Sequence, residues 1–469
     1  MNAVKGGAKS RPTEPVPVPR KCRDAVIVVP GIMGSELVDT ATGAVLWGVA
    51  DPRWYVSAWT FGDSLKKLAV HSPDPATEAR RIKARRLLQF PAFMPVLAGL
   101  EPYTELLNGL RSILPHPDAL LEFAYDWRLP AAYNARLLAE AVDTTLSHWR
   151  RFAASRGPDG SAARAVIIAH SMGGLVVREM ARIPGALDHV RSVITLGTPF
   201  QGTLDAVEML VGERRAPFPL PRKRLRRLAQ TLPAVRDMLP TYPCVDEAGR
   251  LRELTAADLG LDTLEESGQP AAQLPGHICV VGLGQPTHQS LTVNSGQFRL
   301  HRYLLEPGAG GAGTDCEYVD HTGDGTVYRC SAEQEGAEHH FIHQAHGALA
   351  RCKETVNQVT GVLTRRLGPS LGGARIGLDA PDTVARGETF TVRLTGQDAT
   401  GASCVITDIA SGRTEPRPRL RADPGGGRLG SARLTRPGLY YIRAVGGGGS
   451  SVSRMLLVPD ATNSPAEEL

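Results

Sequence analysis

Short apolar runs alternate with longer amphipathic stretches over most of the chain. The runs at 24–29, 120–127 and 163–169 are too short for typical helices and are bounded by turn residues, which favours buried strands. Residues 130–155 instead repeat apolar positions at three- and four-residue spacing, which predicts a long helix. This alternation is typical of a mostly parallel sheet with helices on both faces. We therefore expect an α/β domain over residues 23–368.

The same rhythm predicts further strands at 190–199 and 277–284 and a closing helix at 346–367. Residues 200–276 lack it and are rich in Pro, Arg and Leu. Connections between the strands of a parallel sheet are usually much shorter than this stretch, so we expect a cap or lid insertion there. One helical face of this insertion is apolar and predicts core packing: Leu225, Leu228, Leu232, Val235 and Met238.

The pattern changes to period two after the glycine-rich residues 368–375. Short alternating strands, set apart by Gly, Pro and Asp turns, predict a small all-β sandwich over residues 374–459. The segment RPGLYYIRAV in it resembles immunoglobulin-like domains. The two ends of the chain, residues 1–22 and 460–469, are expected to be a disordered Pro-rich arm and a disordered tail.

Composition and charge narrow the class of protein. The chain has 469 residues, of which 42% are hydrophobic, and a net charge of +5. Seven cysteines without a close pair favour reduced thiols. The absence of an apolar signal segment, and of an apolar window of roughly 18 residues, predicts a soluble, cytoplasmic protein.

Basic side chains gather at residues 80–86 and 214–227. They are either solvated helix faces or a surface for peripheral contact with an anionic membrane. Aromatic residues are not interleaved with these arginines, so no nucleic-acid partner is expected.

The stretch VIIAHSMGGL, residues 166–175, carries the strongest chemical signal. An apolar strand ends at Ser171 and an apolar helix follows, while Ala169, Gly173 and Gly174 are the small residues that a tight strand–turn–helix requires. This is the pattern of a nucleophile elbow, with alanine in place of the more usual first glycine. It predicts an α/β-hydrolase fold with Ser171 as the nucleophile.

A nucleophilic serine needs a histidine base that is oriented by a carboxylate, and in this fold both follow the serine along the chain. Asp324 stands between two glycines and is the expected acid, although such a segment also suits an ordinary turn. Asp320 and Asp315 are weaker candidates. His346, just before the closing helix, is the expected base, with His343 in reserve.

His343 and His346 belong to a cluster of four histidines that also contains His339 and His340. The spacing of the four would also suit a metal ion. Neither an HExxH motif nor a cysteine pair accompanies them. We therefore expect no metal and no cofactor.

An oxyanion hole requires two N–H groups aimed at one point. The N–H of Met172 begins the helix after the serine. The loop VVPGIMGSEL, in which Gly31 and Gly34 permit a tight turn, would supply the N–H of Ile32.

Aromatic residues are concentrated in the segment WGVADPRWYVSAWTF, residues 47–61. Such rings suit a membrane interface, with Trp54 and Trp59 at a substrate lid. They suit packing over the sheet equally well.

Seven motifs occur in one order: VPGIMGSEL, VLWG, YDWR, AHSMGG, LGTPFQG, LPAVRDMLP and GDGTV. In this order they resemble the lecithin:cholesterol acyltransferase family, over roughly residues 24–366. The resemblance implies an α/β-hydrolase fold in which a serine, an acid and a histidine move acyl chains from lipid esters to water or an alcohol. It assigns the triad to Ser171, Asp324 and His346, and the oxyanion donors to Ile32 and Met172.

The chain also departs from that family. It lacks the signal peptides and disulfides of well-known secreted members, so a lipoprotein substrate is not expected. We expect a serine-dependent lipid esterase or acyltransferase of the phospholipase A type. The alternative is a binding or regulatory protein that uses a hydrolase scaffold and holds a protein partner through its β-sandwich.

Overall fold

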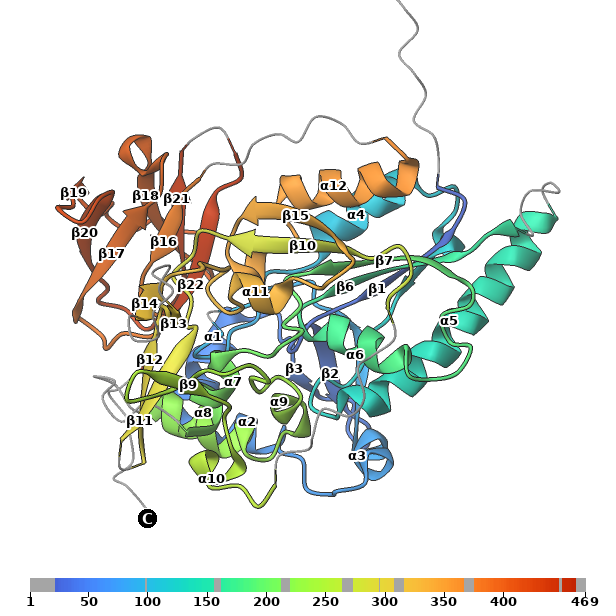
Figure 1. Ribbon diagram of the computed structural model, residues 1–469, viewed down its shortest axis with the longest axis horizontal. Coiled ribbons are helices and arrows are strands. Elements are labelled where there is room, and N and C mark those ends of the chain that lie inside the picture. The colour runs from blue at the N-terminus through green and yellow to red at the C-terminus, as the bar shows by residue number, and fades with distance from the viewer. Residues whose placement is uncertain are drawn as a thin grey trace, which may run out of the picture.

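A computed structural model describes residues 22–97, 99–155, 162–211, 220–263, 273–294, 296–307, 316–366, 375–446 and 449–460 (Figure 1). The expected arm and tail lie outside these ranges except for Cys22 and Asp460. Part of the second basic segment, residues 214–219, also lies outside them.

Six parallel strands form the central sheet, in the order β15–β10–β7–β6–β1–β5. Their bounds are β1 (Ala25–Val29), β5 (Leu120–Glu122), β6 (Ala165–His170), β7 (Val190–Leu196), β10 (Ile278–Leu283) and β15 (Glu338–His343). Strands β1 and β6 are buried at every position, because helices cover both faces of the sheet, and this explains their uniformly apolar sequences. The chain runs from β1 to β5 on one side and continues from β6 on the other. In open α/β sheets, ligands bind at the carboxyl ends of the strands beside such a reversal.

Helices α4 (Thr104–Ile113) and α12 (Lys353–Thr364) cover one face of the sheet, and α5 (Ala131–Ala154) and α6 (Met172–Met180) cover the other (Figure 1). The helix expected at 130–155 is therefore present. The closing helix begins later than expected, because His346–Ala348 form a separate 3₁₀ turn, η3. None of the described helices is long and apolar enough to cross a membrane.

Strand β15 is the one member of the sheet that the apolar pattern does not predict. It lies at the sheet edge, and only Ile342 of its six residues is fully buried. An edge strand with one covered face carries polar side chains, so its sequence, EHHFIH, has no apolar run.

Smaller elements surround the sheet. An antiparallel sheet precedes β5 and has three strands: β2 (Ser35–Asp39), β3 (Val45–Trp47) and β4 (Ile82–Leu87). Three helices accompany it: α1 (Pro52–Phe61), α2 (Asp63–Lys66) and α3 (Pro75–Arg81). After β10 follow β11 (Ser290–Asn294), β12 (Gln297–His301), β13 (Leu304–Pro307), β14 (Cys316–Val319), α11 (Arg329–Ala332) and the short 3₁₀ turn η3.

The stretch expected to be a cap, between β7 and β10, contains four helices and a hairpin among its described residues. These are α7 (Leu204–Val211), α8 (Leu220–Ala229), α9 (Pro233–Arg236), β8 (Val245–Glu247), β9 (Arg250–Arg252) and α10 (Ala256–Leu259). Pro233 begins α9 and so divides the single helix that the apolar spacing predicts. All five apolar residues of that predicted face are buried.

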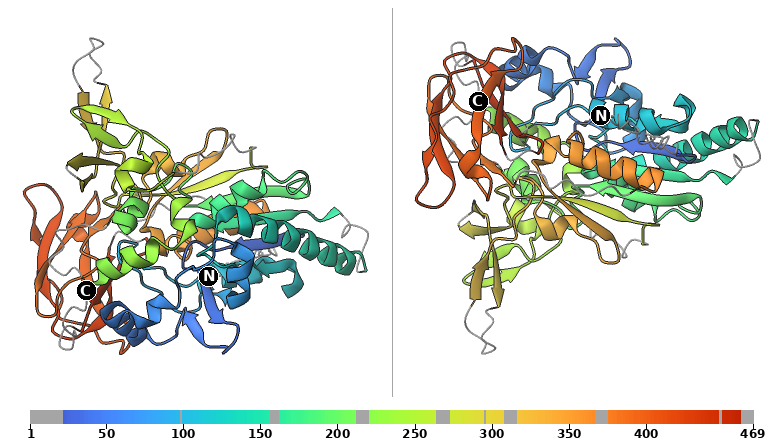
Figure 2. Two further views of the ribbon diagram at one scale, coloured as in Figure 1. Left: turned by 90° about the horizontal axis from the view of Figure 1, so that it is seen from below. Right: turned by 90° about the horizontal axis from the view of Figure 1, so that it is seen from above.

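Two antiparallel sheets form the C-terminal β-domain (Figures 1 and 2). One contains β16 (Gly377–Asp379), β17 (Thr389–Thr395), β19 (Arg421–Ala422) and β20 (Arg428–Arg433). The other contains β18 (Ser403–Asp408), β21 (Gly438–Val445) and β22 (Val452–Val458). The expected combination of an α/β-hydrolase fold with an all-β domain is therefore confirmed.

Alternate residues of β21 and β22 belong to two different apolar cores. One set joins the core between the two sheets of the β-domain: Tyr440, Ile442, Leu456 and Val458. The other set joins the core of the α/β domain: Leu439, Tyr441, Met455 and Leu457. The β-domain thus packs firmly against the α/β domain, at the side toward which the carboxyl ends of β10 and β15 point (Figure 1).

Candidate active site

Ser171 lies at the turn between β6 and α6. Its backbone has φ 52° and ψ −128°, which non-glycine residues rarely adopt. A Cβ on Gly173 would lie 2.4 Å from the carbonyl oxygen of Pro30. One on Gly174 would lie 2.0 Å from Oγ1 of Thr198. The small residues around Ser171 are therefore required by close approach of backbone and side chains.

The structure brings Ser171, His346 and Asp324 into one hydrogen-bonded line. Nε2 of His346 is 2.8 Å from Oγ of Ser171. Nδ1 of His346 is 2.7 Å from Oδ2 of Asp324. All three side chains are buried, and they come from the ends of three separate segments of the chain.

The GDG turn orients the Asp324 carboxylate. Its Oδ1 accepts hydrogen bonds from the N–H groups of Thr326 (3.0 Å) and Val327 (2.7 Å), which leaves Oδ2 for His346. The backbone N–H of His346 donates to the carbonyl oxygen of Asp324 at 2.8 Å. The same aspartate therefore both shapes the loop and orients the imidazole of His346.

The surroundings of His346 act on its pKa in two directions. Burial lowers the pKa, whereas the charge of the Asp324 carboxylate and its hydrogen bond raise it, and the negative charge of Asp205 raises it further. The raising effects are larger together, so the pKa lies above the ordinary value of 6.5. A histidine of this kind accepts a proton readily and keeps it while a negative charge develops nearby.

A second histidine, His170, was not singled out from the sequence. Its Nδ1 is 2.9 Å from the hydroxyl of Tyr103, and its Nε2 is 3.2 Å from the carbonyl oxygen of His346. The Tyr103 oxygen accepts from the N–H of Gly31 at 2.9 Å, so the tyrosine O–H donates to His170. Burial lowers the pKa of His170 to about 3, and the nearby His346 adds to the lowering, so the ring stays neutral. This chain of bonds ties the glycine loop to the loop that carries His346.

The residues of the two expected oxyanion donors, Met172 and Ile32, both lie near Ser171. Met172 is the first residue of α6, where a backbone N–H has no acceptor within the helix. Ile32 lines the same apolar cavity as Ser171, in the loop after β1. A Cβ on Gly31 would lie 2.8 Å from Cβ of Ser171, which shows how closely this loop approaches the serine.

The alternative acids and bases lie elsewhere. Oδ1 of Asp320 accepts from Nε2 of Gln289 at 2.6 Å and from the N–H of Thr322 at 2.7 Å. His343 ends β15, with its ring against Gly284. Asp315 lies outside the described residues.

The other two histidines of the cluster make separate local contacts. Nε2 of His339 accepts from the N–H of Gln334, and Nε2 of His340 is 2.7 Å from Oε1 of Glu338. Over the described ranges, the three side chains that come within metal-binding reach are different ones: Asp205, Glu208 and His288. Arg222 forms an ion pair with Glu208, so we interpret that group as part of a buried ion-pair network.

The two tryptophans expected at a lid pack inside the protein instead. Trp59 is fully buried, and its Nε1 donates to the carbonyl oxygen of Phe93 at 3.0 Å. Trp54 is partly buried and meets Trp47 and Tyr55 edge-on, with ring centroids 6.0 and 5.0 Å away. Neither tryptophan lines the cavities at Ser171 and Asp324.

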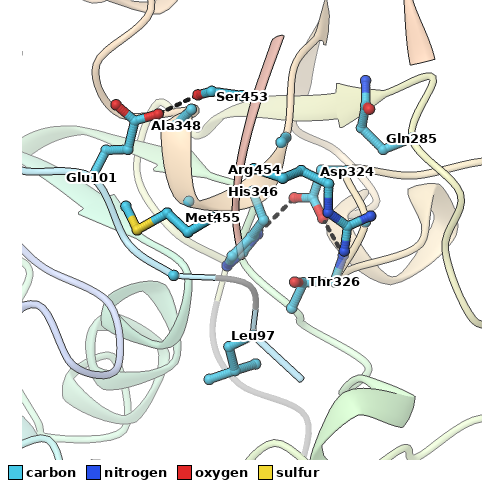
Figure 3. Close-up of a pocket in the computed structure, with 14 residues that line it drawn as sticks. Leu97, Glu101, Gln285, Asp324, Thr326, His346, Ala348, Ser453, Arg454 and Met455 are labelled. Atoms are coloured by element: carbon cyan, nitrogen blue, oxygen red, sulfur yellow. Dashed lines mark hydrogen bonds and ion pairs between the residues drawn. The ribbon is translucent and has the colours of Figure 1, made fainter. Parts of the chain in front are cut away.

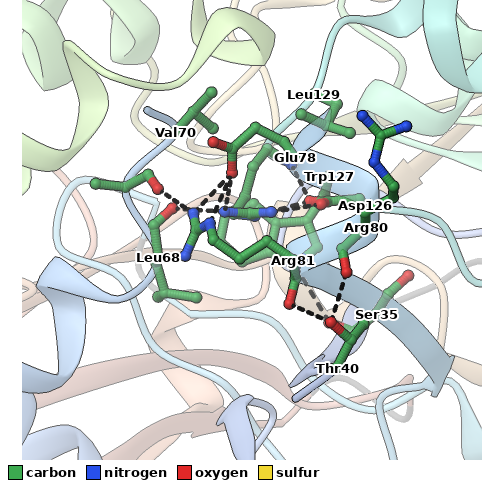
Figure 4. Close-up of polar contacts among 12 residues, drawn as sticks. Ser35, Thr40, Leu68, Val70, Glu78, Arg80, Arg81, Asp126, Trp127 and Leu129 are labelled. Carbon is green, nitrogen blue, oxygen red and sulfur yellow. Dashed lines mark hydrogen bonds and ion pairs between the residues drawn. The ribbon is translucent and has the colours of Figure 1, made fainter. Parts of the chain in front are cut away.

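Part of the first basic segment is engaged in ion pairs within the chain (Figure 4). Three of its arginines pair with buried carboxylates: Arg81 with Glu78, and Arg85 and Arg86 with Glu36. Arg81 also donates to the carbonyl oxygen of Lys67 at 3.0 Å.

The YDWR motif supplies a fully buried ion pair beside this segment. Nε and Nη2 of Arg128 donate to the two oxygens of Asp126 at 2.9 and 2.6 Å. Nη1 of Arg128 donates to the carbonyl oxygen of Leu68 at 3.0 Å and lies 3.8 Å from Glu78. The pair therefore fastens the loop after β5 to the segment around α3.

Two cavities meet at His346. The first reaches Ser171 and is lined mainly by apolar side chains, among them Ile32, Met33, Leu97, Leu100, Met238 and Val327. The second reaches Asp324 and has more polar walls, including Glu101, Gln285, Thr326, Ser453 and Arg454 (Figure 3).

Three features together define the architecture of an α/β hydrolase. They are the strand order of the sheet, the strained turn at the serine, and a serine, an acid and a histidine in that order along the chain. Residues 94–252 match the family model of lecithin:cholesterol acyltransferase. The resemblance predicted from the motifs is confirmed over these residues.

No curated protein sequence matches the chain. Among solved structures, the Tle4–Tli4 complex is similar at 12% identity and TM-score 0.46, covering 72% of this chain and 96% of that one. The mature lipase BlEst2 of Bacillus licheniformis is similar at 13% identity and TM-score 0.29, covering 75% and 96%. Phospholipase PlaB of Legionella pneumophila, with thio-NAD, is similar at 10% identity and TM-score 0.23, covering 80% and 89%.

Proposed function

We propose that the protein is a serine-dependent lipid esterase that transfers acyl groups to water or an alcohol through a seryl acyl-enzyme. The observation that carries this proposal is the buried line from Ser171 through His346 to Asp324, with hydrogen bonds of 2.8 and 2.7 Å. A protein that used the fold only as a scaffold would have no need of this arrangement. A protein partner for the β-domain, a cytoplasmic location and membrane contact stay predictions.

The geometry supports one order of events. Oγ of Ser171 attacks the ester carbonyl carbon while Nε2 of His346 takes the serine proton. The carbonyl oxygen becomes an oxyanion that accepts from the N–H groups of Ile32 and Met172. His346 then gives its proton to the leaving alcohol as the carbon–oxygen bond breaks. Water or another alcohol repeats the sequence on the acyl-enzyme and regenerates Ser171.

The substrate class follows from the walls of the site. The cavity beside Ser171 is lined by Leu, Met, Ile and Val side chains, which suit an acyl chain and offer little to a polar substrate. The lecithin:cholesterol acyltransferase domain points to the same class.

The test is Ser171→Ala. We expect this variant to lose hydrolysis of p-nitrophenyl esters and labelling by a fluorophosphonate, because its side chain cannot form the acyl or phosphonyl bond. Ser155→Ala, at the exposed end of α5, is the matched control and should behave as wild type. Mass spectrometry should find the label on the peptide containing Ser171. Turnover that persists in Ser171→Ala would overturn the proposal.

A further inference from the structure

The β-domain supplies one wall of the polar cavity at Asp324. Strand β22 is the edge strand of its sheet, and Ser453, Arg454 and Met455 of β22 line the cavity together with His346. This domain lies outside the stretch that matches the family model. Strand β22 of the β-domain thus brings side chains to the same cavity as Asp324 and His346.

Contacts on both sides of Arg454 hold this part of β22 in place. Ser453 Oγ donates to the buried Glu101 carboxylate, which also pairs with Arg351. Met455 lies against Gly99, where an added Cβ would be 2.6 Å from the Met455 sulfur. Arg454 is thus presented from a fixed strand rather than from a loose loop.

The Arg454 side chain extends into the cavity beside Asp324 and toward Thr326 (Figure 3). Across the described ranges, Arg454 makes no hydrogen bond or ion pair, although the negative charges of Asp205 and Asp379 lie within electrostatic range. Asp379 is itself held by Arg302, at 2.8 and 3.0 Å. The guanidinium N–H donors of Arg454 are therefore available to a ligand.

We propose that Arg454, with the hydroxyl of Thr326, binds the phosphodiester group of a glycerophospholipid whose ester carbonyl lies at Ser171. This inference rests on the proposed function and assigns a specificity role to the β-domain. A phosphodiester is anionic at any working pH, and a planar guanidinium matches its oxygens with two parallel hydrogen bonds.

The position of the two cavities fits this substrate. The acyl chain enters the apolar cavity at Ser171, and the leaving alcohol departs on the side of His346, where the polar cavity begins. In a glycerophospholipid that alcohol carries the phosphate. A neutral glyceride in the same pose would leave the Arg454 charge unpaired.

The experiment compares two substrates with the same acyl chains, dioleoylphosphatidylglycerol and dioleoylglycerol, in mixed micelles with the full-length protein. For Arg454→Gln we expect the ratio of kcat/KM for the phospholipid to kcat/KM for the glyceride to fall about ten- to hundredfold, the effect of losing a charged hydrogen bond. Arg454→Lys, which keeps the charge, should recover part of the ratio. Thr326→Val should lower the ratio less. Arg421→Gln, exposed on β19, is the matched control.

If Arg454→Gln loses the same factor of kcat/KM on both substrates, Arg454 only supports packing. If Arg454→Gln and Thr326→Val both leave the ratio of the two kcat/KM values unchanged, no phosphate binds there. Either result overturns the inference. Failure of the proposed function is a separate result, because the wild-type protein would then hydrolyse neither substrate and would not react with a fluorophosphonate.

Discussion

Two histidine rings lie 5.1 Å apart at the site, and their surroundings give them opposite properties. Burial lowers the pKa of both. Only His346 has a carboxylate on its ring, so only its pKa ends above the ordinary value, whereas His170 stays neutral and holds loops together. The base is thus selected by its neighbour rather than by its position in the chain.

The shift of His346 predicts the acid side of the pH profile. Protonated His346 cannot accept the Ser171 proton, so kcat/KM should fall as the pH drops through the raised pKa, with a midpoint above 6.5. In Asp324→Asn the main raising influence is removed while burial remains, so the residual activity should have a lower midpoint. The measurement is a pH–rate profile with a small soluble ester. A wild-type midpoint below 6.5 would contradict the assignment of His346 as base.

At the scale of elements, the loops between strands are fixed by buried polar contacts. Arg128 joins the segment around α3 to the loop after β5, because its guanidinium donates both to Asp126 and to the carbonyl oxygen of Leu68. Arg128 is completely buried, so its charge is balanced within the protein. Such a pair adds little to stability as a whole, yet removing one partner is costly.

Arg128→Met should lower the free energy of unfolding by about 3–5 kcal/mol, because Asp126 is left buried without a counter-charge. Urea unfolding followed by tryptophan fluorescence measures this. Arg80→Met, on the exposed face of α3, should change the same quantity by less than about 0.5 kcal/mol. Similar unfolding midpoints for the two variants would argue against the structural role of the YDWR pair.

At the scale of the whole molecule, the β-domain is a structural part of the hydrolase. Four side chains of β21 and β22 complete the core of the α/β domain. Gln285 of the α/β domain makes two hydrogen bonds to the backbone of the β-domain. Its Nε2 donates to the carbonyl oxygen of Ile376 at 3.0 Å, and its Oε1 accepts from the N–H of Leu378 at 2.9 Å. This union is unlike a recognition module on a flexible linker.

Deletion of the chain from residue 375 onward should therefore abolish esterase activity and lower the Tm, or leave the protein insoluble. Each of the four shared side chains contributes about 1.5–3 kcal/mol when fully buried, and the deletion removes all of them. Solubility, a thermal melt and turnover of a small ester are the measurements, with deletion from residue 461 as the control. A shortened protein that melts and turns over like the full chain would show that the β-domain is separable.

Local patterns predicted the parts of this molecule that depend on neighbours in sequence. The apolar runs of β1 and β6, and the small residues around Ser171, are signals of this kind. The apolar pattern does not predict the edge strand β15, because only one of its six residues is buried, and it does not predict η3, because a turn and a helix start share the same residues.

Contacts between distant parts of the chain gave no local signal. Tyr103 meets His170 across 67 residues, and Arg454 approaches Asp324 from another domain. The alternation of β22 shows that it is a strand, but not that both of its faces are covered. The sequence leaves Trp59 open between a lid and a core, because its ring suits both, and only the packing, which buries it completely, distinguishes the two.

The sharing of β21 and β22 between two cores also sets an order of assembly during translation. Ser171, Asp324 and His346 leave the ribosome before the strands that cover their pocket, which end at Val458. Synthesis proceeds at roughly 5–20 residues per second, so the nascent triad waits several seconds for its last wall. We expect the nascent chain to lack the proposed esterase activity until β22 has been released and has packed against the α/β domain.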